Sequence, residues 1–146
     1  MCRETLNLEE WRRRCIQARL RRLKSHAFRP FADEPRDLWS NEIQPSCHGA
    51  AVGVVGAVEG DWTVVTSRGF VAKTAGRVRY VPFSRCKPIV GISADGRELE
   101  SKEYEVQYVV IGRWRRKAYC KNRQTHFVMV GLVRNLPNEV PRHPAY

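Results

Sequence analysis

Acidic residues are missing from two long stretches of the sequence. Residues 62–94 and 106–138 contain no Asp or Glu, because the 15 acids of the chain fall into a few islands outside them. The chain also has 26 Lys and Arg residues and a formal net charge of +11 at pH 7. Segregated charge can build a surface of one sign, which scattered charge cannot. The charge distribution therefore indicates an anionic partner.

Regular cysteine spacing is also lacking. The cysteines form an odd set without a C-x-x-C pair: Cys2, Cys15, Cys47, Cys86 and Cys120. This pattern argues against the disulfide scaffold of a small secreted protein. It also argues against a zinc site, which would need four ligands to converge. We expect reduced thiols, no metal and no cofactor.

The sequence has no long hydrophobic run. Its longest nearly uncharged stretch, residues 43–58, is too short and too rich in glycine to span a bilayer. The N-terminus is charged from Arg3 onward, unlike a secretory signal. Because 42% of the residues are hydrophobic and 28% charged, the composition is typical of a folded domain. We expect a cytoplasmic or nuclear protein that is not secreted and has no membrane partner.

Residues 1–28 predict a basic amphipathic helix. Asn7 can cap it, and Glu10 is in position to complete a capping box. Apolar residues, Trp11 among them, recur every three to five positions and form one stripe. Three arginines fall on other faces: Arg12, Arg19 and Arg22. We expect the stripe, with Trp11, to pack on the core, or to be covered by homodimerisation through this helix.

Residues 29–49 predict an acidic linker that contains prolines. The linker either connects the helix to the core or screens the basic surface until a ligand displaces it. After it, residues 50–136 predict a β-rich core domain. A strand pattern punctuated by turn signals predicts these strands: 50–58, 62–66, 69–74, 77–83, 88–93, 103–112, 114–120 and 126–133.

The last predicted strand, residues 126–133, is an apolar run broken only by Gly131. Its length favours a buried strand, with a helix as the alternative. Residues 137–146 hold three prolines and predict a flexible tail. The fold class is therefore α+β, mostly β: an N-terminal helix followed by a small bent antiparallel sheet or a barrel-like β domain.

A cluster of cations and aromatic rings lies in the second acid-free stretch. It consists of Arg113, Trp114, Arg115, Arg116, Lys117, Lys121 and Arg123. In a strand, Trp114 and Arg116 would share one face and Arg113 and Arg115 the other. If Gly112 opens a hairpin loop, these side chains project together from its tip. A charged edge strand with Trp114 in the core is the plain structural alternative.

Clustered guanidinium groups beside a ring suit a polyanion whose bases can stack. We therefore predict a non-enzymatic protein that binds RNA through the cluster, aided by Arg12, Arg19 and Arg22. DNA and an acidic protein are the alternative partners. Arg77 and Arg79 can extend the positive surface. A compact basic protein of this size fits an accessory protein of a virus or phage.

Thiol chemistry is the competing interpretation. A nucleophilic Cys–His pair needs two residues close in space, and the candidates are His48 or His126 with Cys120 or Cys86. The plain alternative is that these cysteines are small buried apolar residues.

Two short motifs carry a family resemblance. His48-Gly-Ala-Ala-Val-Gly and Thr125-His126-Phe127-Val128 resemble the H-box and Asn-Cys boxes of permuted papain-like acyltransferases and hydrolases. That group includes some small RNA-virus proteins. The resemblance covers about ten residues and implies a thiol hydrolase or acyltransferase. However, the nucleophilic cysteine of the family would fall on Gln124 and its asparagine on Arg123, which implies a relative without the chemistry.

Overall fold

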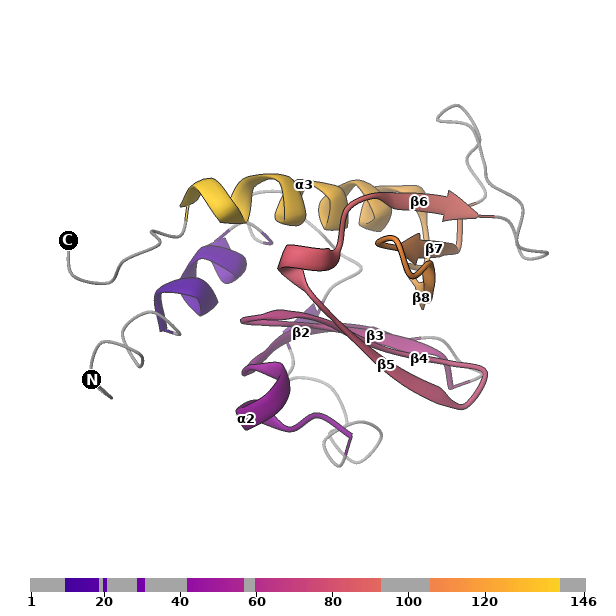
Figure 1. Ribbon diagram of the computed structural model, residues 1–146, viewed down its shortest axis with the longest axis horizontal. Helices are drawn as coiled ribbons and strands as arrows, with labels where there is room; N and C mark the ends of the chain where they lie inside the picture. The colour runs from indigo at the N-terminus through magenta and orange to yellow at the C-terminus, as the bar shows by residue number, and fades with distance from the viewer. Residues whose placement is uncertain are drawn as a thin grey trace.

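Two antiparallel sheets build the molecule, and helix α3 lies with the second sheet on one side of the first (Figure 1). The computed structural model describes residues 10–18, 20, 29–30, 42–56, 60–92 and 106–139. The first sheet has the order β1-β2-β3-β4-β5 and the second the order β6-β7-β8. The predicted α+β class with an N-terminal helix is confirmed, but the described strands form two open sheets and no closed barrel.

The first sheet consists of β1 (Arg29–Pro30), β2 (Ala51–Gly56), β3 (Trp62–Thr66), β4 (Gly69–Thr74) and β5 (Arg77–Pro82). The second consists of β6 (Ile89–Ile92), β7 (Tyr108–Ile111) and β8 (Arg116–Tyr119). The helical elements are a helix over residues 10–18, α2 (Pro45–His48), the 3-10 turn η3 (Phe83–Arg85) and α3 (Arg123–Glu139).

The strands predicted at 62–66 and 69–74 agree with β3 and β4, because period-two alternation and tight turns fix them. The strand predicted at 103–112 is shorter in the structure. β7 begins at Tyr108, residues 101–105 lie outside the described residues, and Val106 and Gln107 are not in a strand.

The strand predicted at 126–133 is wrong, because these residues belong to α3. Asn122 starts the helix: its Oδ1 accepts hydrogen bonds from the backbone N of Thr125 at 2.9 Å and from its hydroxyl at 3.0 Å. The buried residues are spaced by three and four positions: Thr125, Val128, Met129, Leu132 and Val133. The length of the apolar run favours a strand, but the helical spacing of the buried residues matches the core. α3 also continues past residue 136, where we had placed the end of the core domain.

The main core lies between the first sheet and the layer of α3 and the second sheet. Phe70, Val65, Val109 and Met129 all lie in this core, and each is essentially inaccessible to solvent. The first helix adds Ile16, which is fully buried, whereas Trp11 is 49% exposed. Ile16 and not Trp11 therefore anchors this helix.

A second, smaller core covers the outer face of the first sheet. Val54, Val64 and Val71 lie side by side across β2, β3 and β4, with Ile43 and Trp62 beside them. α2 lies on this side of the sheet (Figure 1). The helices within the described ranges are too short or too polar to cross a membrane.

Threonine hydroxyls join the two sheets. Thr63 Oγ1 donates to the carbonyl of Tyr119 at 2.6 Å, and Thr74 Oγ1 donates to the carbonyl of Lys117 at 3.1 Å. Both acceptors lie on β8, the edge strand of the second sheet. Edge carbonyls near a core need a partner, since burial removes their water. These bonds fix β8, and with it the hairpin that β8 forms with β7, on the first sheet.

We predict that Thr63→Val lowers the free energy of unfolding by about 1–3 kcal/mol, because it leaves the Tyr119 carbonyl without its donor. Thr74→Val is the matched control and should cost less, since Thr74 is only half-buried and water can replace its hydroxyl. Urea unfolding followed by circular dichroism measures both. Equal stability of Thr63→Val and the wild type would contradict the role of this bond.

Candidate nucleic-acid interface

The basic cluster forms the tip of a β-hairpin. Residues 112–115 make the turn between β7 and β8, and the backbone N of Arg115 donates to the carbonyl of Gly112 at 3.1 Å. Arg113, Trp114 and Arg115 are all exposed at this tip. Of the two arrangements predicted from the sequence, the structure therefore has the hairpin loop and not a continuous strand.

Trp114 lies on the surface, outside the core. Its side chain is 51% exposed. The guanidinium carbon of Arg85 lies 4.8 Å from the indole centroid, and that of Arg116 lies 5.8 Å from it. Both distances are within reach of a cation–π interaction. The ring is held by two cations and still leaves half of its surface to solvent.

Close packing of backbone brings Arg85 to this tip. The N–H of Gly112 donates to the carbonyl of Pro88 at 2.8 Å, and the φ of Gly112 is +72°. A Cβ on Gly112 would collide with the carbonyl oxygen of Arg85. Only glycine allows this approach. Residues 85–88 are therefore in direct contact with the hairpin turn, and Lys87 is exposed beside it.

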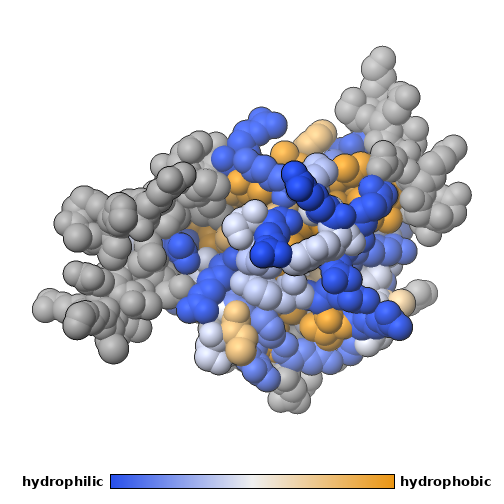
Figure 2. Space-filling model, viewed as in Figure 1, coloured by the Kyte–Doolittle hydropathy of each residue, from blue (hydrophilic) through white to orange (hydrophobic). Residues whose placement is uncertain are grey.

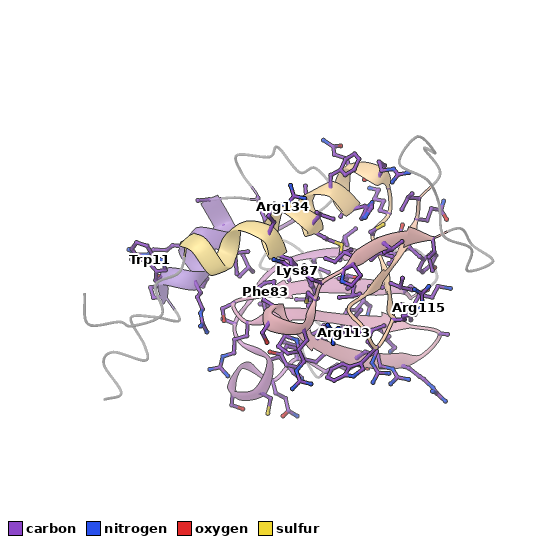
Figure 3. All side chains as sticks on the ribbon, turned by 45° about the horizontal axis from the view of Figure 1, so that its top comes forward. Trp11, Phe83, Lys87, Arg113, Arg115 and Arg134 are labelled. Atoms are coloured by element: carbon purple, nitrogen blue, oxygen red, sulfur yellow. The ribbon has the colours of Figure 1, made fainter. Side chains whose placement is uncertain are left out.

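We call this set of residues the basic hairpin surface: Arg85, Lys87, Arg113, Trp114, Arg115 and Arg116. Arg85 and Lys87 were not predicted from the sequence to belong to this cluster. They lie in the other acid-free stretch, and no local motif links them to Trp114. Figure 3 shows Lys87, Arg113 and Arg115 on the same side of the molecule. Figure 2 shows strongly hydrophilic side chains gathered across the middle of that side.

Arg77 and Arg79 lie next to this surface. By strand alternation they share the inner face of the first sheet with buried Val81. Arg77 pairs with Thr74, whose hydroxyl bonds the carbonyl of Lys117 on β8. β5 therefore brings two further cations close to the hairpin.

Lys117, Lys121 and Arg123 are placed differently. Lys117 Nζ lies 4.5 Å from the ring centroid of Tyr108. Lys121 and Arg123 follow the far end of β8, away from the turn. There Arg123 lies over Phe127, 5.6 Å from its centroid, and Phe127 is 56% exposed. Lys121 and Arg123 therefore lie at the start of α3, and Lys117 lies over Tyr108 within the second sheet.

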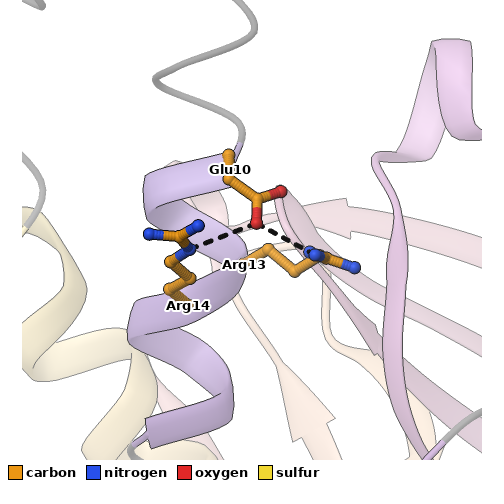
Figure 4. Close-up of polar contacts among 3 residues, drawn as sticks. All are labelled: Glu10, Arg13 and Arg14. Atoms are coloured by element: carbon orange, nitrogen blue, oxygen red, sulfur yellow. Dashed lines mark hydrogen bonds and ion pairs between the residues drawn. The ribbon is translucent and has the colours of Figure 1, made fainter.

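The first helix lies far from the hairpin. Figure 3 shows Trp11 at one end of the molecule, Arg115 toward the other end and Arg113 between them. Arg12 is half-buried on this helix, while Arg19 and Arg22 lie outside the described residues. Glu10 holds the neighbouring cations: its Oε1 lies 2.9 Å from Arg13 Nη2 and 3.2 Å from Arg14 Nε (Figure 4). The described residues of the first helix therefore do not join the cluster at the hairpin.

Carboxylates of the described residues lie away from the basic hairpin surface. Among the described residues, Glu10 forms ion pairs within the first helix. Glu42 forms an ion pair with Lys73, in which Glu42 Oε1 lies 3.2 Å from Lys73 Nζ. Lys73 shares the outer face of the first sheet with Trp62. In the described part of the linker, Glu42 therefore neutralises a lysine on the outer face of the first sheet.

The candidate thiols, Cys86 and Cys120, are buried, and they do not lie in the same part of the structure as His48. Burial raises the pKa of both Cys86 and Cys120 to about 12. Both belong to the main core, whereas His48 packs on Tyr80 of the outer face, with ring centroids 4.9 Å apart. Burial lowers the pKa of His48 and of His126, whose Nε2 lies 3.2 Å from the carbonyl oxygen of Ile89. Within the described ranges, no group of three His, Cys, Asp or Glu could hold a metal ion.

Comparisons with models of protein families, with curated proteins and with solved structures find no match to this chain. The function of the basic hairpin surface must therefore be inferred from its own geometry and charge.

We predict that Gly112→Ala destabilises the protein more than Gly76→Ala does. Both glycines have positive φ, +72° and +77°, so each substitution should cost about 1–2 kcal/mol of backbone strain. Only at Gly112 does the added Cβ meet backbone atoms, which adds roughly 1–3 kcal/mol. Urea unfolding of both variants measures the difference. Equal losses would contradict the close contact between the turn and Arg85.

We also predict that a small electrophile at pH 7.5 modifies Cys47 and leaves Cys86 and Cys120 unmodified in the folded protein. Cys47 is exposed, whereas the other two thiols are buried and stay protonated at this pH. Peptide mapping by mass spectrometry checks this, with urea-unfolded protein as the control in which all three react. Rapid native modification of Cys120 would favour thiol chemistry instead.

Proposed function

We propose that this protein binds RNA through the basic hairpin surface and carries out no catalysis there. The observation that carries the proposal is the half-exposed indole of Trp114, which has the guanidinium groups of Arg85 and Arg116 beside it. A stacked base on such a ring contributes about 1–3 kcal/mol. The adjacent guanidinium groups can each donate paired hydrogen bonds to phosphate oxygens.

Charge around the ring supports a polyanion as the partner. The ion pairs between described residues lie elsewhere, so phosphates would not have to displace a carboxylate of this part of the chain from Arg85 or Arg113. Repulsion among these cations is relieved when an anion binds. Binding should therefore release counterions and weaken steeply with salt.

RNA is favoured over duplex DNA because an exposed ring on a hairpin tip contacts unstacked bases, which RNA loops and ends provide. The tip presents one ring and several cations, without the base-reading helix of a major-groove binder. A role in sequestering or packaging RNA, as in an accessory protein of a virus or phage, remains a prediction from the sequence.

We predict that Trp114→Ala weakens binding of a fluorescein-labelled single-stranded RNA by roughly 5- to 100-fold, because it removes the stacking ring. Arg85→Ala and Arg113→Ala should each lower the slope of log K against log salt by about one. Fluorescence anisotropy at several salt concentrations measures affinity and slope together.

Arg14→Ala is the matched control for this experiment. It removes one cation at the far end of the molecule, where Arg14 is paired with Glu10, so the slope should barely change. Arg12→Ala tests whether the first helix contributes. Similar losses for Arg14, Arg85 and Arg113 would show that net charge alone attracts RNA. Equal competition by heparin, with no effect of Trp114→Ala, would favour an acidic protein as the partner.

A further inference from the structure

A hollow of about 390 Å³ lies between α3 and the segment that enters β6. It is lined by Lys87, Pro88, Ile89, Val130, Val133 and Arg134. Its volume falls within the range of roughly 300–1,000 Å³ that is typical of small-ligand sites. Figure 3 shows Arg134 and Lys87 near each other on the side of the molecule that carries Arg113.

The lining of the hollow has two chemical parts. Val130, Val133 and Ile89 supply an apolar floor, whereas Lys87 and Arg134 are exposed cations at its edge. The lining contains no acid. A flat, largely apolar ring attached to a negative group would match both parts, since the ring would leave water and the anion would meet the cations.

The hollow is continuous with the basic hairpin surface. Lys87 belongs to both, and the carbonyl of Pro88 accepts the N–H of Gly112 at the base of the hairpin turn. On its other side, Phe127 lies one turn before Val130 on α3 and is exposed beneath Arg123. The hollow therefore lies along a surface on which cations and open rings alternate.

We propose that the hollow takes an unpaired nucleobase of the RNA strand whose neighbouring base stacks on Trp114, with Lys87 contacting the phosphate between them. This inference rests on the proposed function, and it specifies single-stranded RNA as the ligand. A duplex cannot supply such bases without breaking pairs, which costs free energy. Single strands should therefore bind more tightly than duplexes of equal length.

The test compares three RNA probes at one salt concentration by anisotropy: a single-stranded 12-mer, its duplex, and a 12-mer with abasic sites at every second position. The wild-type protein should prefer the single strand over both other probes by about tenfold. Trp114→Ala should keep part of this preference. Trp114→Ala combined with Val130→Phe, which fills the hollow, should lose it while duplex binding stays unchanged.

Val78→Phe is the matched control, since Val78 is a partly exposed valine on the outer face of the first sheet. Thermal melts show which variants are folded, and if Val130→Phe is not folded, Arg134→Ala with the abasic probe replaces it. A single-strand preference in the double variant equal to that of Trp114→Ala alone would overturn the inference and leave the proposed function intact. Loss of preference in Val78→Phe would overturn it too. Absence of binding to every probe would refute the proposed function itself.

Discussion

The hydrogen bonds at the edge of β8 are the constraint on which the geometry of the basic hairpin surface depends. Its carbonyls at Lys117 and Tyr119 accept hydrogen bonds from Thr74 and Thr63 of the first sheet. Because these donors come from a different sheet, they fix the position of the β7–β8 hairpin in addition to satisfying polar groups. The turn of that hairpin then meets residues 85–88, and the stacking of Arg85 on Trp114 follows from this contact.

Charge is segregated in space as well as in sequence. Among the described residues, Glu10 pairs within the first helix and Glu42 pairs on the outer face of the first sheet. Asp61 accepts hydrogen bonds from the N–H of Ala75 and the hydroxyl of Tyr108. Each carboxylate thus has a local structural partner. None of these three carboxylates pairs with Arg85 or Arg113, and an anion bound there would relieve repulsion among the cations.

The parts of this fold that could be predicted are those encoded in residues that are neighbours in the sequence. β3 and β4 were predicted correctly because alternation and the turn at Ala75 and Gly76 are encoded in neighbouring residues. α3 was missed because Val and Phe favour strands, whereas its start depends on the single cap Asn122. The stacking of Arg85 on Trp114 could not be predicted, since it depends on a contact between segments far apart in sequence.

The state of Trp114 before binding bears directly on affinity. A free indole at a loop tip would lose conformational freedom when a base stacks on it, and that loss would weaken binding. Here Arg85 and Arg116 already restrict the ring, and Gly112 restricts the turn that carries it. Under the proposed function, a base stacked on this ring would bring its phosphate within reach of these two guanidinium groups. One arrangement would then both orient the base and neutralise its backbone, so that a small hairpin could suffice as a binding element.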